Sequence, residues 1–357
     1  LLLYQIPTAK GSFTCTTIYV NGDVLWTWSY PSLTTIQREL FLHKCGLCKD
    51  SVHHLQFIFS RLQYTWFYIY TTYLEDDTES RLKDVTAFSL VLVTKDFNPE
   101  RYETLCRLFS HQYAQTGNPA SVLENYLSVM TRGICVNGEN GKFSLKEFDT
   151  IQAYAKSQLR LVIDTFGVES ILIYTALLLK KRLVIYCPSL QDLLLYTRAL
   201  PAFAWHRQNW GIVYPYLELR DEELSMLKSS SHYVAGFTDA AVEGRYIELY
   251  DVFVNVPTNQ IIIAQQAKES LAMGKLHKDI AMVMVQAAEN IENSGQDIIK
   301  VITNKTKDLL NNLKSLAVED DSGKSNITLE TLHERKMPPA TENFLFSLAV
   351  CEGFVQL

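Results

Sequence analysis

The sequence has no excess of basic residues. Its 33 Lys and Arg are outnumbered by 39 Asp and Glu, which gives the 357-residue chain a net charge of -6. Proteins that bind nucleic acid or anionic membranes meet the phosphates with a basic surface. The charge balance therefore argues against a nucleic-acid partner and gives no support to a polybasic membrane anchor.

Long hydrophobic runs are also missing. The longest apolar stretch, residues 171–179, is followed at once by Lys180, Lys181 and Arg182, and it is far shorter than the ~20 residues that a bilayer requires. We therefore expect a buried helix there and no transmembrane segment. Residues 1–3 are too short for the apolar region of a signal peptide and lack a basic start, so no signal peptide is expected.

Cysteine is scattered, with seven residues in the whole chain, an odd number that does not indicate a disulfide framework. Cys45 and Cys48, with His43, His53 and His54 nearby, come closest to a zinc motif. No second Cys pair follows, and Cys45 is predicted to close a helix. We therefore expect no zinc site, and we expect the protein to reside in a reducing compartment.

One glycine-rich loop partly imitates a calcium site. Gly141 stands at the bend of an EF-hand-like loop, and Ser144 and Glu147 occupy ligand positions. Val136 and Gly138 stand where the first two oxygen ligands belong, so the oxygen shell cannot be completed. We interpret the loop as a linker and expect no calcium.

The sequence motifs of common enzymes are absent as well. No nucleophile elbow, phosphate-binding P-loop or dinucleotide-binding glycine motif occurs. His206 and His232 are the two histidines of the central region, and a histidine in such a segment is more often packed or exposed than catalytic. We predict no catalytic residue, no cofactor and no covalent chemistry.

Aromatic residues are plentiful, with 19 Tyr and 17 Phe, and they supply material for a core. In the first third, Asn21-Gly22 is a favoured two-residue turn that predicts a hairpin between strands at 16–20 and 23–30. Further strands rich in aromatic and β-branched residues are predicted at 57–62, 65–74 and 85–94. The last is almost continuously apolar, which indicates burial on both faces.

Helix starts can be placed from capping residues in the same third. Asn98-Pro99 and Asn118-Pro119 each combine an asparagine cap with a proline at the first helical position. An earlier helix is expected over 33–41, with Gly46 as its stop. The glycines and asparagines of 133–141 predict a linker or exposed loop.

The middle third alternates helices and strands, which suggests a three-layer α/β core with a partly parallel sheet. Helices are predicted at 148–166, 168–179 and 190–200, a strand at 183–186, and a hairpin at 249–256 and 260–264. Beyond 264 the chain is expected to be almost entirely helical, with an exposed loop at 318–325. The helices of this last segment are predicted at 267–280, 296–316 and 341–353.

Several segments, in this order along the chain, together resemble the DENN-domain family. A buried strand at 88–94 runs through a polar corner into a helix, and residues 171–184 form an apolar helix, a basic corner and a strand. A Trp- and Pro-bearing run follows at 200–210. Residues 233–237 and 251–255 are similar to the late central strands of the family. Two later stretches, 272–278 and 338–344, point to one branch of it.

The resemblance implies a two-lobed α/β module. A longin-like lobe would span 1–132, a linker 133–149 and a three-layer central lobe 150–264, with a helical downstream segment at 265–357. Members of this family hold a Rab GTPase across the two lobes. The expected function is that of a Rab guanine-nucleotide exchange factor in late-endosome and vesicle trafficking, in the cytoplasm and peripheral on late endosomes.

The branch also implies an alternative, that of a non-catalytic scaffold or adaptor subunit of the COMMD–coiled-coil endosomal recycling assembly. Four apolar residues of the last helix could dock on a coiled coil, although they could equally pack on the central lobe. These residues are Phe344, Leu345, Leu348 and Phe354.

The GTPase contact surface is predicted at the corner between strand and helix, together with the Trp run. Asn98 also serves as a helix cap, and the tryptophans could instead belong to the core. The predicted contact residues are Lys95, Asp96, Phe97, Asn98, Trp205 and Trp210.

Overall fold

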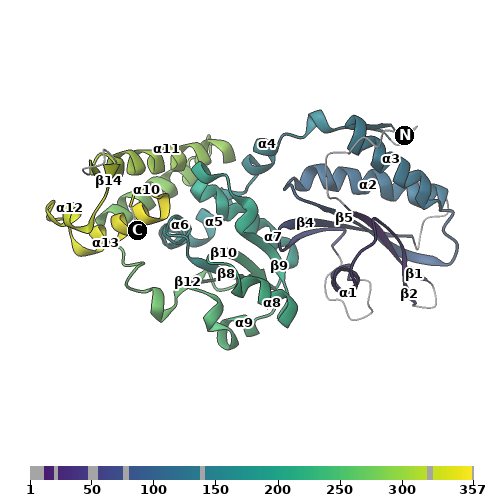
Figure 1. Cartoon of the computed structure of the whole chain (residues 1–357), viewed down its shortest axis with the longest axis horizontal. Helices are drawn as coiled ribbons and strands as arrows, with labels where there is room; N and C mark the ends of the chain where they lie inside the picture. The colour runs from purple at the N-terminus through teal and green to yellow at the C-terminus, as the bar shows by residue number, and fades with distance from the viewer. Residues whose placement is uncertain are drawn as a thin grey trace. The chain divides into compact units, whose positions relative to one another are not determined.

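The computed structural model describes residues 12–19, 23–46, 55–74, 80–136, 141–319 and 325–355. The chain divides into two compact units, Leu1–Ala153 and Tyr154–Leu357 (Figure 1). The sequence-based prediction placed the division in a linker at 133–149.

The first unit is built on a five-stranded antiparallel sheet with the order β2-β1-β5-β4-β3. All five strands were predicted from the sequence to within a few residues, and the turn of the first hairpin lies outside the described residues. The strands are β1 (Ser12–Tyr19), β2 (Val24–Tyr30), β3 (Phe57–Leu62), β4 (Thr65–Tyr73) and β5 (Val85–Thr94).

Helices cover both faces of this sheet. Neighbouring residues of a strand point to opposite faces, so a single strand can contact both helical layers. Phe67 of β4 packs against Phe41 of α1 (Thr35–Lys44), with ring centroids 5.3 Å apart. The next residue, Tyr68, stacks at 4.3 Å on Tyr102 of α2 (Pro99–Thr116). Figure 1 shows α1 on one side of the sheet and α2 with α3 (Pro119–Arg132) on the other.

Both predicted asparagine caps are present. The side chain of Asn98 accepts a hydrogen bond from the backbone N–H of Arg101 at 3.2 Å, and Asn118 accepts one from Ala120 at 3.0 Å. Cys45 closes α1 as predicted. The predicted linker is partly structured, because β6 (Ile134–Val136) pairs with β7 (Lys142–Ser144) in a short hairpin.

The second unit contains a five-stranded sheet with the order β12-β11-β8-β10-β9. The four strands from β11 to β9 are parallel, and β12 is antiparallel to β11 in the predicted hairpin. The strands are β8 (Arg182–Tyr186), β9 (Val213–Leu217), β10 (Tyr233–Phe237), β11 (Val252–Asn255) and β12 (Gln260–Ile263). Periodicity alone did not predict β9.

Helices lie on both faces of this sheet, so the predicted three-layer α/β arrangement is present. Ala235 of β10 shares a buried cluster with Leu224 of α8 (Asp221–Lys228) and Val242 of α9 (Ala241–Arg245). On the opposite face, a side chain at Gly236 would meet Leu193 and Thr197 of α7 (Leu190–Ala199).

The helix predicted at 148–166 is wrong as one element. The structure has a 3-10 turn η2 (Leu145–Glu147), then α4 (Thr150–Ala155) and α5 (Leu159–Phe166), with Ser157 between the two helices. The Ser157 hydroxyl bonds the carbonyl oxygens of Tyr154 and Arg198, and this local hydrogen bonding competes with helix continuation. Periodicity carried no sign of that break.

Among the described residues, the helical stretch Thr150–Leu178 is long and apolar enough to cross a membrane by length and composition. It continues after α5 through η3 (Gly167–Glu169) into α6 (Ser170–Leu178). Within its most apolar window 61% is buried inside the protein, and it contacts the helices α10 and α11. Burial of this kind is the pattern of a core helix.

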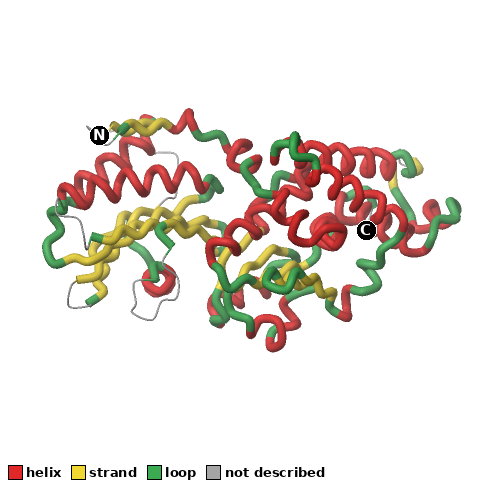
Figure 2. The backbone as a smooth tube through the Cα atoms, turned by 180° about the vertical axis from the view of Figure 1, so that it is seen from behind, coloured by secondary structure: helices red, strands yellow, loops and turns green. Residues whose placement is uncertain are grey.

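The C-terminal segment is helix-rich, and Figure 2 shows it as the red tubes around the C-terminus. The helix predicted at 267–280 begins later, since η7 (Gln265–Ala267) and a turn precede α10. The predicted loop at 318–325 includes two short paired strands, β13 (Val318–Glu319) and β14 (Ser325–Asn326). The helices are α10 (Lys275–Glu289), α11 (Gly295–Lys314), α12 (Leu329–His333) and α13 (Pro339–Glu352).

Candidate functional site

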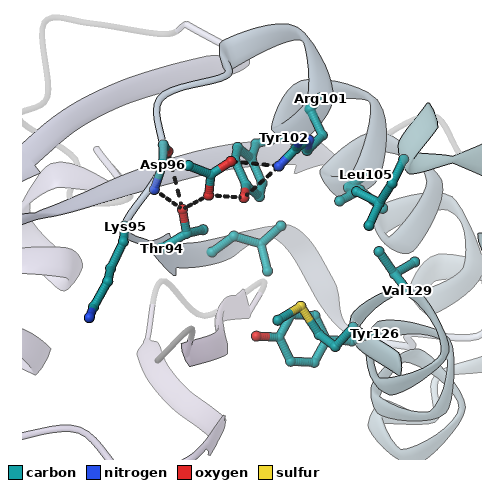
Figure 3. A pocket seen from close by; sticks show the side chains of 11 residues that line it. Thr94, Lys95, Asp96, Arg101, Tyr102, Leu105, Tyr126 and Val129 are labelled. Atoms are coloured by element: carbon teal, nitrogen blue, oxygen red, sulfur yellow. Dashed lines mark hydrogen bonds and ion pairs between the residues drawn. The ribbon is translucent and has the colours of Figure 1, made fainter. Parts of the chain in front are cut away.

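The corner between β5 and α2 is held by a dense hydrogen-bond network around Asp96 (Figure 3). One carboxylate oxygen of Asp96 accepts from the hydroxyls of Thr94 at 2.8 Å and Tyr102 at 2.6 Å. The other accepts from Arg101 Nη1 at 2.5 Å. Each partner fixes one direction of the carboxylate, so Asp96 is held in place although its side chain is 42% exposed.

Tyr68, which sequence reasoning did not assign to the site, also holds the corner in place. Its hydroxyl accepts from the backbone N–H of Asn98 and donates to the carbonyl oxygen of Asp96, both at 3.0 Å. A buried tyrosine on a strand normally finds a partner for its hydroxyl, and that is the signal that could have indicated the contact. The backbone of the corner is therefore tied to β4.

The four predicted corner residues divide into two pairs. Phe97 and Asn98 are buried, Phe97 against the rings of Phe59 and Trp66 and Asn98 as the helix cap. Lys95 is exposed, and Asp96 lies partly at the surface. Within the described residues, only Lys95 and Asp96 of this set can present their side chains to a partner in this conformation.

The two tryptophans of the second unit also differ. Trp210 is fully buried, stacks on Tyr154 at 4.0 Å and donates its indole N–H to the carbonyl oxygen of Arg198 at 3.0 Å. Trp205 is half-buried and packs edge-on against Trp210 at 5.8 Å. Trp210 is thus a core residue, which was the alternative for the tryptophans, and Trp205 alone reaches the surface.

Next to Trp205, three polar side chains form a cluster that the sequence did not reveal. Arg207 pairs with Glu352 at the end of α13 and also donates to the carbonyl oxygens of Leu177 and Leu178 at 2.8 and 2.7 Å. His206 Nε2 lies 3.1 Å from the same Glu352 carboxylate. Burial would raise the pKa of Glu352, but His206 and Arg207 outweigh it and lower that pKa to about 2.

The residues proposed for docking on a coiled coil lie mostly inside the second unit. Phe344, Leu345 and Leu348 are buried, and Phe344 packs against His277 at 4.5 Å. Phe354 is half-buried, with the Lys314 ammonium 5.0 Å from its ring. In this conformation the three buried side chains pack within the unit, and only Phe354 is open to a partner.

Within the part of the chain that the structure describes, no group of three or more His, Cys, Asp or Glu residues could hold a metal ion. Cys48, His53 and His54 of the zinc-like pattern lie outside that part. His232 lies beside β10, where burial and the charges of Lys180 and Arg207 lower its pKa.

Comparison with known proteins addresses the whole chain. A family model described as "Stabilization of polarity axis" matches residues 156–265, the part of the second unit that holds its sheet. The chain is 46% identical over 338 residues to DENN domain-containing protein 10 of Danio rerio, covering 95% of each. It is 44% identical to the Homo sapiens protein of that name, covering 94% of each.

A more distant relative extends the comparison. DENN domain-containing protein 10 of Dictyostelium discoideum is 38% identical over 347 residues, covering 93% of this chain and 94% of the relative. The mixed α/β fold and these matches place the chain among DENN-domain proteins. Within that class, it belongs to the DENN domain-containing protein 10 family. This confirms both the predicted resemblance and the branch indicated by residues 272–278 and 338–344.

Proposed function

We propose that the protein binds a Rab GTPase and accelerates its nucleotide exchange during trafficking at late endosomes, where it acts as a peripheral cytoplasmic protein. The observation that carries the proposal is the match over about 95% of the chain to relatives named for their DENN domain. It covers both units, as a module that holds a GTPase across two lobes requires.

Exchange of this kind needs no covalent intermediate. In a Rab, bound GDP and Mg²⁺ hold the switch loops in one arrangement. A partner that binds the nucleotide-free arrangement more tightly must weaken nucleotide binding by the same factor, because the two binding equilibria are linked. A broad and rigid surface is sufficient for this, and a cluster of catalytic side chains is not required.

The β5–α2 corner has the properties of such a surface. Asp96 is fixed by Thr94, Arg101 and Tyr102, so little side-chain freedom remains to be lost when a partner binds it. Lys95 beside it is an exposed cation with no ion pair among the described residues. We propose that Lys95 and Asp96 contact the GTPase directly. Trp205, on the second unit, stays a separately predicted contact.

The test is GDP release from a panel of purified Rab proteins, with and without the full chain. We expect one Rab to be accelerated selectively, and Lys95→Glu to reduce that acceleration about tenfold, as the loss of one interface charge pair can do. Lys83→Glu makes the same charge change at another exposed lysine of the first unit and should leave the rate unchanged.

Asp96→Arg is a poor variant for this purpose. It would place a second cation beside Arg101 and break the network around the corner, so lost activity would not separate contact from folding. If the folded protein accelerated GDP release from no Rab, the exchange proposal would be ruled out. If Lys95→Glu and Lys83→Glu changed the rate of GDP release equally, only the assignment of the contact to the corner would be ruled out.

The alternative proposal is that of an adaptor subunit of the COMMD–coiled-coil endosomal recycling assembly. The half-buried ring of Phe354 is the one docking candidate open to a partner. Purified coiled-coil subunits should then bind the chain without any Rab, and Phe354→Glu should weaken that binding. If Phe354→Glu bound the coiled-coil subunits unchanged, Phe354 would not be part of the docking surface. If the unmodified chain did not bind them at all, the adaptor role would be ruled out.

A further inference from the structure

The second unit contains a cavity of about 480 Å³ between the end of α6 and the segment that leads into β9. Its volume lies within the range of small-molecule sites. The apolar part of its lining comes from α6, from the 3-10 helix η4 (Leu200–Arg207) and from the 3-10 turn η5 (Trp210–Ile212). This part consists of Leu177, Pro201, Ala204 and Ile212.

The polar part of the lining is basic. It comprises Lys180, Arg207 and His232 together with the amides Gln208 and Asn209. No Asp or Glu of the described residues lines the cavity. Arg207 is paired with Glu352, so these two charges offset each other. Lys180 is exposed and forms no ion pair with the part of the chain that the structure describes, so its charge is left for a ligand.

The ring of His232 reports where the charge of Lys180 lies. The ring is half-buried, with Nδ1 3.0 Å from the Ser231 hydroxyl, and Nε2 has no hydrogen-bond partner among the described residues. Burial lowers the pKa of His232, and the positive charges of Lys180 and Arg207 lower it further. Charges more than ~10 Å apart are largely screened at moderate ionic strength. The Lys180 ammonium therefore lies close to the ring, on the side of the cavity.

The two amides add donors to this basic wall. Asn209 Oδ1 accepts from the backbone N–H of Gly211 at 3.0 Å, so the NH₂ group of Asn209 is the part left for a ligand. Gln208 is exposed, and its side chain has no hydrogen bond within the described chain. The cavity thus offers several N–H donors and one uncompensated positive charge, which is what an anion with several acceptor oxygens requires.

We propose that this cavity binds a small phosphate monoester, with the phosphate at Lys180 and His232 and the rest of the ligand against the apolar lining. A phosphate monoester carries a charge of about -1.5 to -2 near neutral pH and three acceptor oxygens, and it can therefore accept from several of these donors at once. The ester could belong to a soluble molecule or to a lipid headgroup. The inference does not depend on GTPase binding, and its test requires no GTPase.

Glucose 6-phosphate is a probe of suitable chemistry, and glucose is the same sugar without the charge. We would titrate each, at constant ionic strength, into the full chain labelled with ¹³C-histidine and follow the eight histidine signals by nuclear magnetic resonance, with His232 assigned by His232→Gln. Saturation with glucose 6-phosphate should raise the pKa of His232 by about one unit, because a bound anion favours the protonated ring. Glucose should leave it unchanged. His333, whose ring is 83% exposed and does not line the cavity, is the reference.

A matched pair of lysine variants tests the site itself. Lys180→Gln should weaken binding of glucose 6-phosphate about tenfold, through loss of one charge-assisted contact. Lys307→Gln removes the same charge from an exposed position of α11 that does not line the cavity, and should have no effect. Lys180→Asn guards against misfolding. The backbone at Lys180 has a φ of 49°, in the left-handed region that asparagine tolerates, so this variant should fold and still bind weakly.

A flotation assay with phosphatidylcholine vesicles, with and without phosphatidylinositol 4-phosphate, distinguishes the two sources. Retention that requires the phosphorylated lipid and that glucose 6-phosphate competes away would assign the site to a headgroup. Absence of retention, with binding of glucose 6-phosphate intact, would assign it to a soluble ester. If glucose 6-phosphate left the pKa of His232 unchanged up to its solubility limit, the proposal would be overturned. Equal weakening by Lys180→Gln and Lys307→Gln would overturn it as well, because binding would then follow overall charge.

Discussion

Tyr102 donates its phenolic hydroxyl to the carboxylate of Asp96 at 2.6 Å, which joins a buried position of α2 to the surface of the corner. Burial raises the pKa of Tyr102, and the negative charge of Asp96 raises it further. The hydroxyl therefore keeps its proton and remains a donor at any pH at which the protein functions. The orientation of Asp96 at the surface therefore depends on a buried residue of α2.

Removing this hydroxyl should lower the stability of the protein and loosen the hydrogen-bond network around Asp96. We expect Tyr102→Phe to lower the free energy of unfolding by about 1–2 kcal/mol, because one acceptor bond of the carboxylate is lost. Urea denaturation near neutral pH measures this. Tyr64→Phe is the control, since Tyr64 is 84% exposed and its substitution should be neutral. Equal effects of the two variants would show that the hydroxyl of Tyr102 contributes nothing.

Gly236 in β10 leaves no space for a side chain. A Cβ there would lie 2.2 Å from the carbonyl oxygen of Pro215 in the neighbouring strand, and backbone of a sheet cannot easily move away. We expect Gly236→Ala to cost about 3 kcal/mol or more, at the upper end of overpacking effects. The measurement is the denaturation midpoint of each variant.

Gly244 in α9 provides the matched control. A Cβ there would meet nothing within 4 Å, so Gly244→Ala should be neutral or slightly stabilising through the better helix propensity of alanine. If Gly236→Ala were as stable as Gly244→Ala, the close approach of β9 and β10 would be wrong.

The sequence-based predictions succeeded where the signal for an element lies within the element itself. Asn98-Pro99 and Asn118-Pro119 are local signals, and both helices begin where those signals indicated. The strands of the first unit carry aromatic and β-branched residues, whose preference for a pleated surface is also local. The family was identified because several such segments occur in a fixed order.

The features that were missed depend on contacts between distant residues. Ser157, at the break in the predicted helix, bonds the carbonyl oxygen of Arg198, 41 positions away, as well as the nearby one of Tyr154. The Glu352 carboxylate meets Arg207 across 145 positions, and Tyr68 reaches the corner from another strand. Periodicity describes one element at a time, so it cannot reveal a partner on a different element. Phe97 and Asn98 were assigned to the surface for the same reason.

His277 should make stability depend on pH near neutrality. Its Nδ1 accepts the backbone N–H of Gly274 at 3.1 Å, and its ring is buried against Phe344. Burial lowers the pKa of His277 from its ordinary 6.5, so the folded state favours the neutral ring. Its contribution is therefore complete above about pH 6.5 and decreases as the pH falls below that value.

The measurement compares urea denaturation at about pH 7.5 and about pH 5.5. The unmodified protein should lose more stability on acidification than His277→Gln, whose amide oxygen can still accept from Gly274. Parallel losses in the two proteins would assign the pH dependence to other groups.

Glu352 should also make the protein less stable as the pH falls, but at lower pH than His277. Its pKa of about 2 in the folded protein lies below the ordinary 4.5, so unfolding takes up a proton and becomes easier as the pH falls between those values. We expect Glu352→Gln to lose roughly 1–2 kcal/mol near neutral pH, discounted because solvent partly screens the cluster. The difference from the unmodified protein should then shrink as the pH approaches about 3, where the carboxylate loses its advantage. Thermal denaturation followed by circular dichroism at each pH measures this, and a difference that stayed constant would mean that the charge of Glu352 does not anchor α13 to Arg207.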